Sequence, residues 1–201
     1  ATLLQATLPG APCIYYGDEL GMRGTKANWG SDANDIPMRE PFKWNAVAGP
    51  PMSNYFVLNS LAYNNRAERD SDTRSVQEQS GVSGSLLETY RSLIALRRSH
   101  VALRRGDYAG VPNSSGAVWA FVREAATETL LVAINLASVT QNASLDLSTF
   151  ELPAGGSDVR DIVSGASLPG LTAGTWRAYA VSIPAYGWVL LNANVAPGPP
   201  P

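Results

Sequence analysis

The sequence predicts an α/β segment followed by an all-β domain, and three observations along the 201-residue chain support this order. Residues 13–16 form a short, continuous apolar run, which is typical of a strand buried on both faces in a parallel sheet. Residues 85–100 have the spacing of an amphipathic helix. From residue 106, short runs with a period of two alternate with Gly, Pro and Ser. The predicted parts are an α/β portion over 1–105, an antiparallel β-sandwich over 106–193 and a Pro-rich tail or linker over 194–201.

Composition and charge narrow the classes of partner. An apolar content of 45% and a charged content of 16% fit a folded globular protein. The formal net charge of −2 provides no basic surface, so no nucleic acid partner is expected. No run approaches the ~18 apolar residues of a membrane-spanning helix, so no membrane partner is expected. With Cys13 and His100 as the single cysteine and histidine, the sequence identifies no metal site and no cofactor.

The first strand-like run ends at Gly17, which frees the backbone before two carboxylates, Asp18 and Glu19. In a β/α barrel, the carboxyl end of a strand is the face where active sites are built. The long connection that follows, residues 23–51, is rich in Gly, Asn, Asp and Pro and also contains Trp29 and Trp44. A loop of this length is usually functional or disordered, and its aromatic and charged content favours a functional one. The alternative is a surface loop with no ligand role.

The remaining elements follow in order. Residues 55–65 are compatible with a short helix, and the polar stretch 70–84 is expected to be a loop. The helix over 85–100 begins with a capping-box pattern, Ser85-x-x-Glu88, and has Arg97 and Arg98 where they suit the helix dipole. Strands are expected at 117–123, 129–135, 143–147, 159–163, 176–183 and 187–191, a spacing typical of an antiparallel sandwich. Trp119, Trp176 and Trp188 fall in these runs, where core packing is favoured over a surface role.

Three segments resemble one known family. Residues 8–22, Leu-Pro-Gly-Ala-Pro-Cys-Ile-Tyr-Tyr-Gly-Asp-Glu-Leu-Gly-Met, resemble the eighth barrel strand of the α-amylase clan of glycoside hydrolases. Residues 36–44 resemble a loop segment of that clan, and residues 85–100 resemble its last barrel helix. The resemblance implies the terminal strand–loop–helix part of a (β/α)8 TIM barrel, followed by a β-sandwich domain.

The resemblance also implies an activity and its limits. The clan cleaves α-glucosidic bonds of starch-like or related oligosaccharides by a retaining two-carboxylate mechanism, and its catalytic Asp, Glu and Asp lie on earlier strands. No motif here matches them, and a complete barrel needs about 250 residues. We therefore expect a C-terminal portion of a longer enzyme, inactive in isolation, whose partners are an α-glucan or oligosaccharide substrate and the N-terminal barrel region. The resemblance leaves room for a structural calcium ion in the parent enzyme.

The residues expected to matter form the cleft wall or support its loops rather than perform catalysis. Two carboxyl groups that cleave a glycosidic bond with retention lie about 5–5.5 Å apart across it. Adjacent residues on an extended chain point to opposite faces, so Asp18 and Glu19 are not expected to be such a pair. Arg39 could clamp a carboxylate, and aromatic rings could stack on sugars or pack in the core. The candidates are Tyr16, Asp18, Glu19, Trp29, Arg39 and Trp44.

Two alternatives stay open at this point. The chain could be a non-catalytic carbohydrate-binding or partner-binding module, or part of a clan member that performs transglycosylation or isomerisation. Fold alone does not decide among these. For the location, a secreted or periplasmic protein is favoured over a cytoplasmic one.

Overall fold

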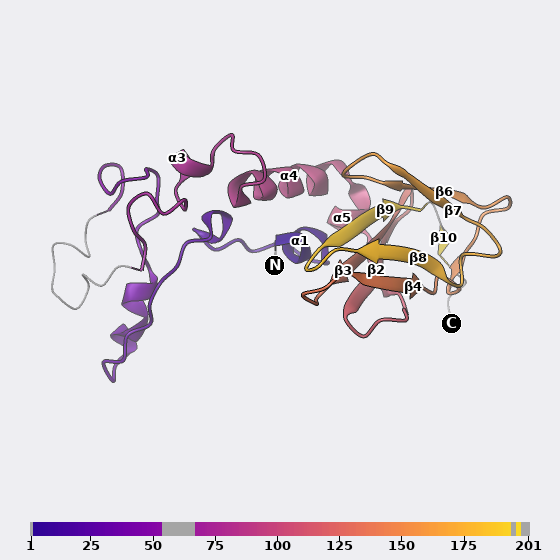
Figure 1. Cartoon of the computed structure of the whole chain (residues 1–201), viewed down its shortest axis with the longest axis horizontal. Coiled ribbons are helices and arrows are strands. Elements are labelled where there is room, and N and C mark those ends of the chain that lie inside the picture. Colours follow the sequence, from indigo (N-terminus) through magenta and orange to yellow (C-terminus); the bar gives the residue numbers. More distant parts are fainter. Residues whose placement is uncertain (1, 54–66, 194–195, 198–201) are drawn as a thin grey trace. The chain divides into compact units, whose positions relative to one another are not determined.

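The computed structural model describes residues 2–53, 67–193 and 196–197 (Figure 1). By its internal contacts the chain divides into two compact units, each described here by itself. The first comprises Ala1–Gln5 and Pro12–Ala95, and the second comprises Ala6–Ala11 and Leu96–Pro201. The domain boundary expected at residue 105 stays a prediction.

The described part of the first unit is built from short helices and extended loops. Its 3-10 helices are η1 (Asp18–Leu20) and η2 (Asp32–Met38), and its α-helix α3 spans Val76–Gln79. The helices α1 (Thr2–Thr7) and α4 (Leu86–Ser99) each begin in this unit. No described helix is long and apolar enough to cross a membrane.

The strand expected at residues 13–16 is an exposed extended segment. Cys13 is exposed, and Ile14, Tyr15 and Tyr16 are 37%, 56% and 42% exposed. The prediction of a strand buried on both faces, with Cys13 in the core, is wrong for the described chain. A strand needs a hydrogen-bonding neighbour, and no described segment of this unit pairs with residues 13–16.

The helix predicted over residues 85–100 is confirmed as α4, but its capping box is half formed. The Ser85 hydroxyl accepts a hydrogen bond from the Glu88 N–H at 3.3 Å, whereas the Glu88 carboxylate accepts from the Gly81 N–H at 2.8 Å. A complete capping box, formed by Ser75 and Glu78, begins α3 in the stretch predicted to be a loop. A four-residue helix has too little periodicity to predict it. The short helix expected at 55–65 lies outside the described residues.

The second unit is an antiparallel β-structure that follows the helix α5 (Val101–Arg105) (Figure 1). Its six-stranded sheet has the order β1 (Asp107–Gly110), β2 (Val118–Ala125), β3 (Glu128–Asn135), β9 (Trp188–Asn192), β6 (Ser157–Asp161) and β7 (Ser167–Leu171). A second sheet pairs β4 (Gln141–Leu145) with β8 (Tyr179–Ile183), and a third pairs β5 (Phe150–Glu151) with β10 (Ala196–Pro197).

The core of this unit lies on one face of the six-stranded sheet. Alternate residues of β2, such as Ala120 and Val122, cluster with Leu145 of β4 and Val181 and Ile183 of β8. This alternation is the period of two that the sequence predicts for an antiparallel sandwich. The opposite face of β2 and β3 is contacted by α5, whose Ala102 and Leu103 have no solvent exposure.

Two buried arginines hold residues 6–10 within the second unit. Arg97 donates to the carbonyl oxygens of Ala6 at 2.8 Å, Leu8 at 3.2 Å and Gly10 at 2.7 Å. Arg123 of β2 donates to the Thr7 carbonyl and, at 2.8 Å, to that of Gly106. Burial lowers the pKa of both guanidinium groups. Arg97, which was expected to complement the dipole of its own helix, instead binds carbonyl groups of a segment far away in the sequence.

Candidate functional site

The turn after the extended segment holds the two predicted carboxylates. Gly17 has a φ of +93°, and an added Cβ there would lie 2.9 Å from the Met22 side chain, so a side chain is excluded on both counts. The Glu19 carboxylate accepts a hydrogen bond from the Gly17 N–H at 2.9 Å. The exposed Asp18 carboxylate accepts from the Tyr15 N–H at 3.2 Å. Both carboxylates therefore bind the backbone of their own turn.

The extended segment is tied to helix α4 by one polar link. The Gln5 side chain donates to the Cys13 carbonyl at 3.1 Å and accepts from the Tyr90 hydroxyl at 2.9 Å. The Tyr16 ring, at the end of this segment, packs 4.7 Å from the Tyr15 ring between centroids. Tyr16, Asp18 and Glu19 thus lie together on one turn.

The other three candidates lie on the loop that follows. The Trp29 N–H donates to the Asn34 side chain at 2.6 Å, and the Trp29 ring is 39% exposed. Arg39 ends η2, where its N–H donates to the Ile36 carbonyl at 3.0 Å. Trp44 is 48% exposed and packs edge-on against Phe42, with ring centroids 4.8 Å apart.

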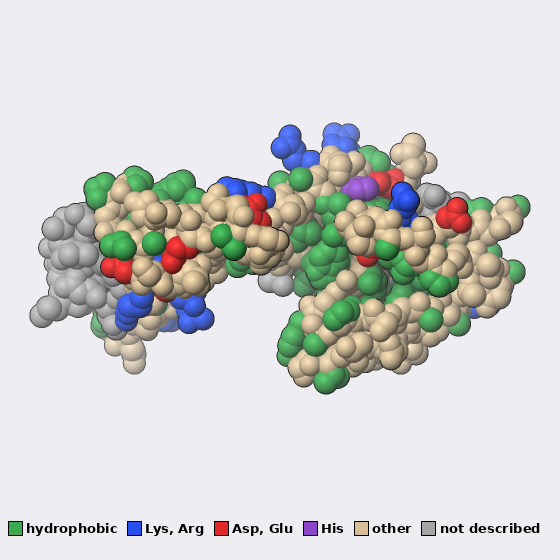
Figure 2. Space-filling view, turned by 45° about the horizontal axis from the view of Figure 1, so that its top comes forward, with side chains coloured by type: hydrophobic (Ala, Val, Ile, Leu, Met, Phe, Trp, Pro, Cys, Tyr) green, Lys and Arg blue, Asp and Glu red, His purple; other side chains and the backbone are tan. Residues whose placement is uncertain are grey.

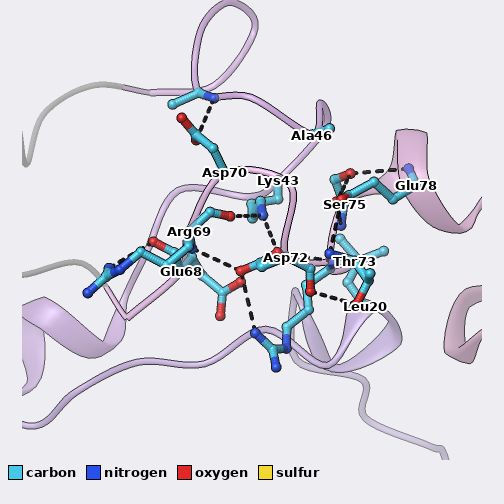
Figure 3. A network of polar contacts seen from close by, with 12 residues as sticks. Leu20, Lys43, Ala46, Glu68, Arg69, Asp70, Asp72, Thr73, Ser75 and Glu78 are labelled. Carbon is cyan, nitrogen blue, oxygen red and sulfur yellow. Dashed lines mark hydrogen bonds and ion pairs between the residues drawn. The ribbon is translucent and has the colours of Figure 1, made fainter.

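A buried polar network holds this loop, and sequence reasoning did not identify it (Figure 3). Lys43, next to Trp44, has a fully buried side chain whose ammonium group donates to the Arg69 carbonyl at 2.6 Å and pairs with Asp72. Asp72 also accepts from the backbone N–H groups of Arg69 at 2.9 Å and Arg74 at 3.1 Å. A fully buried lysine is rare unless it is paired. Because Lys43 is paired with Asp72, it ties the loop that carries Trp44, which we call the Trp44 loop, to residues 69–72.

Gln79 connects the loop around Asp72 to the turn that carries Asp18 and Glu19, which we call the carboxylate turn. Its side-chain amide donates to the carbonyls of Leu20 at 2.8 Å and Thr73 at 3.0 Å, and accepts from the Leu87 N–H at 2.9 Å. One side chain therefore joins η1, the 70–75 loop and the first turn of α4. We refer to Lys43, Glu68, Asp72 and Gln79 as the Lys43 network.

Glu68 is the carboxyl group of this network whose pKa is raised. Its side chain is fully buried, and desolvation raises its pKa, although the Arg23 N–H donates to Oε1 at 2.5 Å. Desolvation also opposes ionisation of Asp72, but hydrogen bonds from Lys43 and from backbone N–H groups outweigh it and hold the pKa of Asp72 well below its usual range. Glu68 Oε2 is buried without a hydrogen-bond partner among the described residues, and the nearby Asp72 carboxylate adds to the desolvation that raises the pKa of Glu68.

Replacing Glu68 with glutamine is expected to raise the free energy of unfolding at pH 7 to 8 by about 1 kcal/mol, the scale of one hydrogen bond. The raised pKa means that stability from protonated Glu68 is present in acid and is lost as the pH rises through the folded-state value. Glutamine keeps the donor and the acceptor at all pH values. Urea unfolding from pH 4 to 8 tests this, with Glu19→Gln as the control on a half-buried carboxylate. An E68Q variant that is less stable than wild type at pH 8 would contradict the stability cost of burying the Glu68 charge.

The described residues contain no group of three or more His, Cys, Asp or Glu side chains arranged to hold a metal ion. What they do provide is a turn with carboxylates, an aromatic loop and an internal network that fixes both, followed by an antiparallel β-unit.

Comparison with known protein families identifies the family to which the chain belongs. The family model "Alpha amylase, catalytic domain" matches residues 1–106, and "Maltogenic Amylase, C-terminal domain" matches residues 111–190. The chain belongs to the α-amylase family. The resemblance seen in the three sequence segments is thereby confirmed.

The relatives include enzymes and a transporter subunit. The trehalose synthase/amylase TreS of Mycobacterium tuberculosis (strain H37Rv) is 33% identical over 161 residues, covering 73% of this chain and 24% of TreS. The cyclomaltodextrinase of Geobacillus thermopakistaniensis is 26% identical, covering 94% of this chain and 24% of that protein. The amino acid transporter heavy chain SLC3A2 of Rattus norvegicus is 33% identical, covering 76% and 25%. The chain spans about a quarter of the length of these relatives.

Solved structures confirm the predicted fold class. The α-amylase from H. orenii matches with a TM-score of 0.63 and 26% identity, covering 96% of this chain and 34% of that one. A trehalulose synthase MutB variant matches with a TM-score of 0.64 and 20% identity, covering 96% and 37%, a likeness that concerns the fold alone.

Proposed function

We propose that the chain is the C-terminal portion of an α-amylase-type glycoside hydrolase or transglycosylase acting on α-glucosidic bonds of oligosaccharides. The observation that carries this is the carboxylate turn and Trp44 loop, held together by the Lys43 network within the region that the catalytic-domain model matches. TreS, the cyclomaltodextrinase and the H. orenii amylase are named for activities of this class.

In this proposal, the chain supports the cleft and does not perform the bond cleavage. Asp18 and Glu19 are engaged with the backbone of their own turn, which is a supporting rather than a reacting arrangement. The catalytic carboxylates of a retaining mechanism would come from further barrel chain, the N-terminal barrel region, as the partner of this one. Tyr16, Trp29 and Trp44 would contribute aromatic surface, and Arg39 would organise the loop.

The test compares the isolated 201-residue chain with the longest natural product of its gene that contains it. Both are incubated with maltotriose and soluble starch, and the anomeric form of released sugar is followed by NMR. We expect no turnover by the isolated chain, and release of the α-anomer or transfer products by the longer protein. Turnover by the isolated chain, or a longer protein without hydrolysis and transfer, would overturn the proposal.

A non-catalytic role is the second candidate, and one observation favours it. The SLC3A2 heavy chain is as identical to this chain as TreS is, and its name denotes a transporter subunit. The same assay separates the two, because a non-catalytic longer protein would show neither hydrolysis nor transfer.

A further inference from the structure

One buried side chain connects the carboxylate turn to two other segments of the first unit. Gln79 is 7% exposed, and its amide group donates to the carbonyl oxygens of Leu20 at 2.8 Å and Thr73 at 3.0 Å. Its amide oxygen accepts from the Leu87 N–H at 2.9 Å. Both N–H donors and the oxygen of the glutamine amide are therefore engaged. Because the three partners are backbone groups of three separate segments, the contacts fix the amide in one orientation.

The Leu87 N–H is available to Gln79 because it lies in the first turn of helix α4. The first four N–H groups of an α-helix have no partner within the helix, and α4 begins at Leu86. The Ser85 hydroxyl accepts from a neighbouring N–H, that of Glu88, at 3.3 Å. Gln79 accepts from Leu87, so the beginning of the helix and the carboxylate turn share one partner.

Gln79 is itself held in place by its own backbone. It is the last residue of α3, where its N–H donates to the Ser75 carbonyl at 3.1 Å. Its carbonyl oxygen accepts from the Ser85 hydroxyl at 2.9 Å and from the Val82 N–H at 3.1 Å. Ser75 also forms the capping box that begins α3. The residue that carries the amide is therefore fixed on both sides.

The carboxylate turn meets Gln79 at the end of η1. Leu20 is the last residue of η1 and is 1% exposed, and the Gly21 N–H that follows it donates to the Asp18 carbonyl at 3.1 Å. Gly21 also lies close to the first residue of α4, because a Cβ added to it would be 3.3 Å from the Leu86 side chain. A shift of the Leu20 carbonyl would therefore displace the whole carboxylate turn.

The group that makes this connection is uncharged. Figure 2 shows charged side chains at the surface of the chain, where salt screens their interactions. The Gln79 amide is buried and does not titrate. Its hydrogen bonds therefore stay the same over the range of salt and pH in which the chain is folded.

We propose that Gln79 is a positioning residue for substrate binding, which holds the carboxylate turn in its place in the cleft wall. Gln79 is buried and its polar atoms are engaged with backbone groups, so it acts through the turn. This inference rests on the proposed function, since the turn affects a substrate only where it lines the cleft. Displacing a cleft wall weakens the binding of substrate and transition state alike, which raises KM and leaves kcat nearly unchanged.

The test replaces the amide in the longest natural product of the gene. Gln79→Met keeps the length of the side chain and removes its three hydrogen bonds, whereas Gln79→Glu keeps the acceptor for Leu87 and removes both donors. The matched control is Asn135→Leu, which removes a second buried amide that donates to three backbone carbonyls of the β-rich unit. Hydrogen exchange of the amides of residues 17–22 is followed by mass spectrometry. KM and kcat are measured with maltotriose or soluble starch, whichever the wild type converts.

Both Gln79 variants are expected to speed the exchange of residues 17–22 and to raise KM roughly tenfold, with kcat within about twofold of wild type, since tenfold corresponds to about one lost hydrogen bond to the substrate. Asn135→Leu should change neither the exchange of these residues nor KM. A merely structural role of Gln79 would instead lower the active fraction, and therefore kcat, at an unchanged KM. That result, or exchange raised throughout the protein in both Gln79 variants, would overturn the inference.

The two proposals can fail separately. An active protein in which the Gln79 variants leave KM and the exchange of residues 17–22 unchanged would refute this inference alone. A wild-type protein that shows neither hydrolysis nor transfer would refute the proposed function, and with it the effect on substrate. Faster exchange of residues 17–22 in its Gln79 variants would still support the contact between Gln79 and the turn.

Discussion

Replacing Lys43 with methionine is expected to lower the free energy of unfolding of the chain by about 3 kcal/mol, because it breaks a buried ion pair by removing one partner. The Lys43 side chain has no exposure, and the Asp72 side chain is 13% exposed. Methionine fills most of the lysine volume, so the loss reports the charge and its hydrogen bonds rather than a cavity. Urea unfolding at pH 7 measures it.

A matched control is Lys26→Met, which removes a lysine whose ion pair with Asp35 is exposed, at 67% and 53% for the two side chains. Exposed pairs contribute about 0–1 kcal/mol, so this variant should remain close to wild type. In the double variant with Asp72→Asn, the combined loss should be smaller than the sum of the two single losses. Equal losses for K43M and K26M would show that the buried pair is not a stabilising anchor.

The sign of the pH dependence provides a second measurement on the same pair. The pKa of Asp72 is held well below its usual range by hydrogen bonds that outweigh desolvation. Its contribution to stability is therefore present above the unfolded-state pKa and is lost as the pH falls through the folded-state value. The deficit of D72N against wild type should be largest near neutral pH and should shrink in acid. This is opposite to the trend expected for Glu68.

Arg97→Met is expected to lower the free energy of unfolding by about 3 kcal/mol, since it removes three hydrogen bonds from a buried, charged donor to backbone carbonyl groups. Those carbonyls belong to Ala6, Leu8 and Gly10, and Arg97 is 9% exposed. Arg97→Lys should recover less than half of this loss, because one ammonium group cannot reproduce the planar fork of the guanidinium. Denaturant midpoints of the three proteins provide the comparison.

The neighbouring residue provides the control for this prediction. Arg98 is exposed, and Arg98→Met keeps the helix and changes the net charge by the same amount. Surface substitutions of this kind usually stay within about 0.5 kcal/mol of wild type. A result in which R97M and R98M are equally stable would mean that the carbonyl contacts of Arg97 do not hold residues 6–10.

Part of the candidate site could be predicted from the sequence. The Gly17-Asp18-Glu19 turn and the aromatic residues of the following loop stand out by residue type alone, and the structure places them on one turn and one loop. Their roles in substrate contact stay predictions. The network that holds them could not be predicted, since Lys43 and Asp72 are 29 residues apart and nothing in their local pattern marks them as partners.

The sequence by itself determined the family, helix α4 and the period-two strands of the β-rich unit, because each is carried by local spacing or by a dense motif. Only the tertiary structure decided that residues 13–16 are exposed, that Arg97 binds residues 6–10 and that Lys43 is buried. Burial and long-range hydrogen bonds depend on which distant segments meet. Local periodicity indicates which face of an element is apolar, but it does not indicate which other segment covers that face.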